Sequence, residues 1–227
     1  MSILTPKNLF VFCISLKIII LCSFFSCSKD FAVGNNQSKN NWKCDQQADE
    51  ALMNGDYESG ILLHQQLLKK EPANVLVHCH LGYAYGQIGN HTMEVKNYEQ
   101  AISYGYNWDD TLFFNLAMAY SELGMLQKAI SVFEEALIIN PESANSHFGL
   151  GLIYQAESAF QPAEIEFLKA IKIEPTHLEA RFNLSKIYFY RKEYLKAVYQ
   201  LEKVLKYDPS YKEAYELKKE IDKLIQN

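Results

Sequence analysis

Two stretches of the chain decide the fold, NLAMAYSELGMLQKAISVFEEALIINP (115–141) and LGLIYQAESAFQPAEIEFLKAIKIEP (150–175), because each nearly repeats the other. Small and apolar residues follow the same order in both, and both end on a proline. Four tyrosines, Tyr85, Tyr120, Tyr154 and Tyr188, recur at spacings of 35, 34 and 34 residues. A fixed period in this range predicts a solenoid, in which each unit buries its apolar face against its neighbours.

Each unit is predicted to form two helices. In the unit that starts near residue 110, apolar and small residues recur at helical spacing up to Tyr120, and a second apolar stripe follows Gly124. Gly151 and Ala163 are expected where paired helices cross, since larger side chains would force them apart. The closing proline ends the second helix, because it lacks an N–H group and collides with the preceding turn. Capping boxes are expected at Thr176–Glu179 and Ser210–Glu213.

This pattern resembles the tetratricopeptide repeat. The resemblance rests on Leu-Gly-x-x-Tyr at 81–85, on the trio Ala129, Phe133 and Ala136, and on the closing prolines. It implies an all-α fold, a right-handed superhelical solenoid of about five helix pairs over residues 42–210. A C-terminal capping helix over 211–227 is expected, with a Lys- and Glu-rich outer side. In the first pair, Gly60 and His64 replace the small and aromatic residues of the later pairs.

The first residues are predicted to be a signal peptide, 1–26. Lys7 and Lys17 are the only charges ahead of Cys27, and an apolar run of eight residues begins at Ile18. A membrane-spanning helix needs about 20 apolar residues, so the run favours a secretory signal over a plain membrane anchor, which is the alternative.

The junction after this run resembles the lipobox of bacterial lipoproteins. In FFSCSKD (24–30), a small residue precedes Cys27, which the resemblance makes the site of lipid attachment. Phe24 and Phe25 depart from the commonest lipobox and leave ordinary signal cleavage open. Residues 27–41 are then expected to form a flexible, polar, lipid-anchored tether. Cys44 and Cys79 could pair in an oxidising compartment, although a buried, unpaired Cys79 is the favoured interpretation.

No pattern of catalytic residues stands out, so the chain is predicted not to be an enzyme, with no cofactor, no metal site and no small-molecule substrate. His78 and His80 point about 200° apart on a helix and could not hold one ion. Glu164 and Glu166 are expected on solvent-facing sides. The net charge of −5 argues against nucleic acid as a partner, because phosphate binding needs a basic surface.

A second apolar stripe on the first helix of each pair is left over after packing. In tetratricopeptide proteins such stripes line the concave groove that receives a partner's peptide. The resemblance therefore implies a groove built of Tyr83, Phe114, Met118, Phe148, Leu152, Phe182, Phe189 and Tyr190. Lys186 is the only basic residue expected in this groove, and the scarcity of cations favours an apolar or aromatic protein segment as the ligand. Alternatively, the chain's own tether or C-terminal helix covers the groove.

The function expected from these features is that of a non-catalytic, lipid-anchored adaptor of the bacterial cell envelope. It would hold a protein or peptide partner in its groove and face the periplasm or the surface of the outer membrane. The alternative is a structural protein that associates with itself through the same face and holds no foreign ligand.

Overall fold

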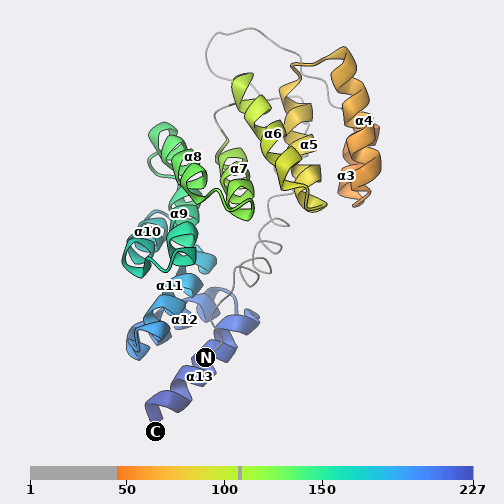
Figure 1. Cartoon of the computed structure of the whole chain (residues 1–227). Helices are drawn as coiled ribbons and strands as arrows, with labels where there is room; N and C mark the ends of the chain where they lie inside the picture. Colours follow the sequence, from red (N-terminus) through yellow and green to blue (C-terminus); the bar gives the residue numbers. More distant parts are fainter. Residues whose placement is uncertain (1–44, 107–108, 227) are drawn as a thin grey trace. The chain divides into compact units, whose positions relative to one another are not determined.

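A computed structural model describes residues 45–106 and 109–226, which form eleven α-helices and no strand (Figure 1). The predictions for residues 1–44, the signal peptide, Cys27 and the tether, lie outside this part. The helices are α3 (Gln46–Met53), α4 (Tyr57–Lys70), α5 (Val75–Gln87), α6 (His91–Ser103), α7 (Asp110–Glu122), α8 (Leu126–Ile139), α9 (Ala144–Ala156), α10 (Phe160–Ile173), α11 (Leu178–Tyr190), α12 (Tyr194–Tyr207) and α13 (Lys212–Gln226).

The helices form two compact units that divide after Met125. In the first unit, α3 to α7 pack in chain order, each helix against the next. In the second unit, α8 to α13 do the same, so that α13 packs against α12 at the end of the chain. Packing of each element against its neighbours in sequence is the defining property of a solenoid. The predicted all-α fold of repeated helix pairs with a C-terminal helix is confirmed.

Glycines allow the two helices of a pair to approach closely. A Cβ atom on Gly151 of α9 would lie 2.5 Å from the ring of Phe167 on α10. A Cβ atom on Gly82 of α5 would lie 2.6 Å from the ring of Tyr98 on α6. Both rings are fully buried and have no room to withdraw. The small residue of the first helix and the aromatic residue of the second, which define the repeat, are therefore in direct contact with each other.

A side-chain cap starts the first helix of each pair, and in the four later pairs this cap holds a constant place in the repeat. The N-cap side chains accept a hydrogen bond from a backbone N–H in the first turn, which satisfies a donor that has no partner within the helix. These caps are Asp45, Asn74, Asp109, Ser143 and His177. The predicted capping box at Thr176 is wrong by one residue, because His177 caps α11. The Ser210 hydroxyl donates instead to Asp208, 2.6 Å away.

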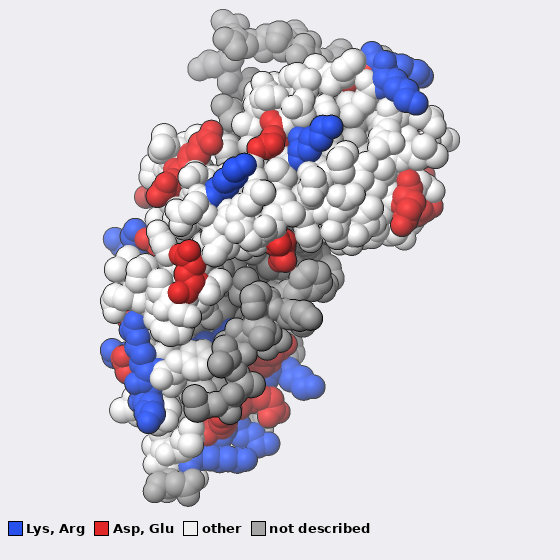
Figure 2. Space-filling model, viewed as in Figure 1, with Lys and Arg blue, Asp and Glu red and all other residues white. Residues whose placement is uncertain are grey.

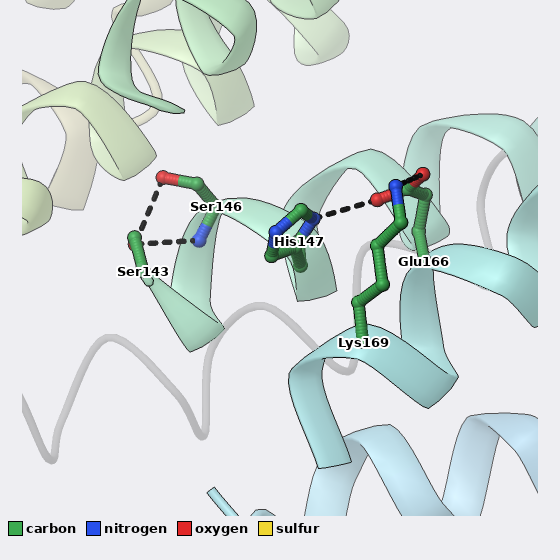
Figure 3. Close-up of polar contacts among 5 residues, drawn as sticks. All are labelled: Ser143, Ser146, His147, Glu166 and Lys169. Carbon is green, nitrogen blue, oxygen red and sulfur yellow. Dashed lines mark hydrogen bonds and ion pairs between the residues drawn. The ribbon is translucent and has the colours of Figure 1, made fainter. Parts of the chain in front are cut away.

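Polar side chains at a constant separation in sequence tie the two helices of three pairs together. His147 Nδ1 lies 2.7 Å from Glu166 Oε2, and Glu166 also accepts from Lys169 (Figure 3). The equivalent bond in the last pair joins Arg181 to Gln200, at 2.8 Å. In the second pair, His78 and Asn97 make the same connection. The expectation that Glu166 merely faces solvent is wrong, since its carboxylate joins α9 to α10.

Two of the recurring tyrosines donate a hydrogen bond to the second helix of the preceding pair. Tyr120 donates to Glu99, and burial together with this carboxylate raises the pKa of Tyr120 to about 12. Tyr188 donates to Glu164 at 3.0 Å, and Arg191 forms an ion pair with the same carboxylate. Glu164 is thus a link between α10 and α11, contrary to the expectation of a purely solvated side chain.

The terminal helix α13 buries one side and exposes charge on the other. Ala214 and Ile221 are fully buried, whereas Lys212, Glu216 and Lys219 are exposed. On the face that Figure 2 shows, Lys and Arg are interspersed with Asp and Glu among the described residues, and no basic patch forms there. None of the helices between residues 45 and 226 is long and apolar enough to cross a membrane.

Candidate partner-binding surface

The eight residues predicted to line a groove lie on the first helices α5, α7, α9 and α11, but most are covered. Five are buried: Tyr83, Phe114, Met118, Phe148 and Phe182. Leu152 and Phe189 are half-buried, and only Tyr190 is largely exposed, at 49%. The solvent exposure expected of residues that line a groove is therefore not found at Phe114, Phe148 and Phe182. A role of these residues in partner binding stays a prediction.

Phe148 and Phe182 are each in contact with an aromatic or imidazole ring from the start of the next helix or helix pair. The ring of Phe148 lies 4.7 Å from that of His177, measured between centroids, and 5.9 Å from that of Phe167. The ring of Phe182 lies 5.3 Å from that of Tyr211, the residue just before α13. His177 and Tyr211 hold the same position in successive repeats. For Phe182, the alternative that the C-terminal segment covers the predicted groove fits this contact.

Four aromatic rings remain at or near the surface of the second unit, where α10 begins, α11 ends and α12 begins. They touch in a chain, which we call the aromatic cluster: Phe160, Tyr190, Phe189 and Tyr194. Phe160 stacks on Tyr190 at 6.2 Å between centroids, Tyr190 meets Phe189 at 5.9 Å, and Phe189 meets Tyr194 at 6.2 Å. Burial and the nearby Glu220 carboxylate raise the pKa of Tyr190, so its hydroxyl stays neutral and able to donate.

One cation lies beside the predicted groove. Lys186 is half-buried on α11, with its ammonium 5.7 Å above the ring of Phe182 and 3.4 Å from Asn183 Oδ1. Burial lowers the pKa of Lys186, because the charged form loses hydration. The aromatic face and the amide oxygen compensate part of that loss.

Sequence reasoning missed a polar cluster inside the first unit. Asp49 of α3 places Oδ1 2.8 Å from His80 Nδ1 of α5 and 3.3 Å from His64 Nε2 of α4. All three side chains are buried. Burial alone would raise the pKa of Asp49, but its contacts with His64 and His80 lower it well below its usual range. One ligand atom from each residue lies within 4.8 Å of the others, close enough to hold a metal ion.

His78 and His80 point apart on α5, as the helical spacing predicts. His78 turns to Asn97 and to the carbonyl of Pro72. His80 meets His64 instead, at 5.1 Å between ring centroids. The sequence indicated the contact between His64 and His80 only through His64, which stands at a position that is aromatic in most later repeats. Cys79 is buried and unpaired among the described residues, and Cys44 lies outside them.

Family models of the tetratricopeptide repeat match residues 76–104, 111–143, 144–177 and 178–211, more than half of the chain. The chain is a tetratricopeptide-repeat (TPR) protein. The matched ranges coincide with the helix pairs α5/α6, α7/α8, α9/α10 and α11/α12. TPR domains serve as protein-interaction scaffolds, and the family is generally non-catalytic.

Several solved TPR structures share the fold. A crystal structure of MamA has 22% identity, covers 75% of this chain and 99% of its own, and gives a TM-score of 0.65. A thermophilic TPR protein of Thermus thermophilus has 22% identity, 77% and 95% coverage and a TM-score of 0.62. YrrB, described as a TPR protein with an unusual peptide-binding site, has 20% identity, 76% and 88% coverage and a TM-score of 0.58. No curated protein matches the chain.

The burial of Phe148 gives a direct test of this surface. Truncation of Phe148 to Ala should lower the free energy of unfolding by about 3–5 kcal/mol, because it removes a ring packed on Phe167 and His177. Tyr190→Ala should change it by about 1 kcal/mol or less, since half of that ring already meets water. Urea unfolding of both variants measures the difference. Equal losses would contradict the assignment of Phe148 to the core and Tyr190 to the surface.

Proposed function

We propose that this TPR protein is a non-catalytic adaptor that binds an apolar or aromatic segment of a partner protein. The observation that carries the proposal is the aromatic cluster, in which four touching rings stay half-buried or exposed on one unit. Contiguous exposed apolar surface is uncommon on soluble domains unless it serves an interaction. Aromatic side chains also dominate the affinity of many protein interfaces.

Other features of the second unit also fit a peptide ligand. Tyr190 keeps a neutral hydroxyl that can donate to a backbone carbonyl. Leu152 and Lys186 are half-buried on α9 and α11 at the same position of successive repeats. Leu152 can contact an apolar side chain of a bound segment, and the Lys186 ammonium can donate a hydrogen bond to an acceptor on the same segment. YrrB, a protein of this fold, is described as having a peptide-binding site, which supports the same use here.

The alternative remains self-association, with a second copy of the chain on the same surface. A photo-crosslinking amino acid at position 190, compared with one at position 138, distinguishes the two. Ile138 on α8 is the matched control, because its side chain is 82% exposed and lies outside the cluster. In native membranes we expect position 190 to give a discrete adduct with another protein and position 138 to give none. An adduct of twice the chain's mass with purified protein would favour self-association, and identical adducts from both positions would contradict the site.

We further propose that the chain is a lipoprotein of the bacterial cell envelope, acylated at Cys27. The support is the sequence alone: an apolar run of eight residues that stops just before Ser26 and Cys27. A clickable palmitate analogue should label the wild type and leave Cys27→Ala unlabelled, with Cys79→Ala as the control that keeps the label. Label that persists in Cys27→Ala would refute the anchor and leave the adaptor proposal untouched.

A further inference from the structure

We propose that Asp49, His64 and His80 form a binding site for a divalent first-row transition metal ion of the Zn²⁺ type. One donor comes from each of three helices: a carboxylate oxygen of α3 and imidazole nitrogens of α4 and α5. Two nitrogens and one oxygen are the donor set that three-ligand zinc sites use, with a water molecule as the fourth ligand.

The distances suit such an ion. Ligands about 2.1 Å from a tetrahedral centre lie about 3.4 Å from one another. Asp49 Oδ1 lies 3.3 Å from His64 Nε2 and 2.8 Å from His80 Nδ1, so small side-chain movements would complete the geometry.

The repeat shows that these residues are departures from the packing pattern. The position of His64 is held by Tyr98, Phe133, Phe167 and Leu201 in the four later pairs. The position of Asp49 is held by Tyr83, Met118, Leu152 and Lys186, and that of His80 by Asn115, Gly149 and Asn183. At the corresponding place in the second unit, Gly149 packs against the ring of Phe133. Where the first pair meets α5 of the second, three ligating side chains thus replace an ordinary contact between helices.

A buried imidazole at this place needs a polar partner. His64 is completely buried, and among the described residues neither of its ring nitrogens has a hydrogen-bond partner. Nε2 lies 3.3 Å from Asp49 Oδ1, and the same oxygen lies 2.8 Å from His80 Nδ1, but neither contact has the geometry of a hydrogen bond. Polar groups buried in this way destabilise a fold unless they are compensated. An ion on Nε2 and Oδ1 would compensate both atoms at once.

The consequence of metal binding would be structural. The ion would join α3, the shortest of the described helices, to α4 and α5. The first pair, α3 and α4, lacks the contact between a small and an aromatic residue that joins the helices of later pairs. Coordination of one ion by residues of α3, α4 and α5 would replace that contact. Binding free energy at a site that exists only in the folded chain stabilises the fold directly.

Metal titration of the purified, untagged protein tests the inference. Because the site is buried, Zn²⁺ is added both to native protein and before refolding from urea. We expect one bound equivalent by mass spectrometry of metals, and a Tm increase of about 5 °C or more in about 100 μM Zn²⁺. Co²⁺ in place of Zn²⁺ should give the visible absorption bands of a tetrahedral complex.

His64→Phe is the decisive variant, because Phe restores the residue type of the later repeats and should let the chain fold. It should bind no Zn²⁺ at this site and show no Tm increase, while Asp49→Asn should weaken binding by about tenfold or more. His147→Gln, which alters a histidine of the second unit, should bind like the wild type. Less than one equivalent with no change of Tm in the wild type, or equal binding by His64→Phe, would overturn the site and leave the adaptor proposal standing.

Discussion

The contact between a buried aromatic ring on one helix and a glycine on its partner sets the spacing of the second and fourth helix pairs, and the rest of the structure depends on it. In the fourth pair, Phe167 lies against Gly151 so closely that a single added carbon would collide with the ring. Tyr98 and Gly82 make the same contact in the second pair. Because each ring is also fully buried, neither helix can shift without opening a cavity. The hydrogen bonds between helices, such as that of His147 with Glu166, form at a separation that this contact sets.

The helix pairs could be predicted from the sequence because the period is long and regular. The starts of α5, α7, α9 and α11 recur with the predicted period, since a capping residue recurs at each. The exposure of the groove residues could not be predicted in this way. Phe148 is covered by His177, which belongs to the next repeat and caps another helix. A helical face tells which way a side chain points, but not which loop residue covers it.

The aromatic cluster and the buried Asp49–His64–His80 cluster could each be predicted only in part from the sequence. Tyr190 and Phe189 were predicted as binding residues, and they are among the three that keep exposure, but their contacts with Phe160 and Tyr194 join residues of three helices. His64 was visible as an exception to the repeat. Its meaning depended on Asp49 and His80, which a pattern within one helix does not connect.

A double-mutant cycle on Gly151 and Phe167 tests the central claim most directly. Gly151→Ala should lower the free energy of unfolding by about 1–3 kcal/mol in the wild type, even though Ala favours a helix by up to about 1 kcal/mol. In a Phe167→Leu background, where the ring is gone, the same change should become neutral or stabilising, so that the two sites couple by more than about 1 kcal/mol. An equal effect of Gly151→Ala in both backgrounds would contradict the claim that this ring sets the spacing.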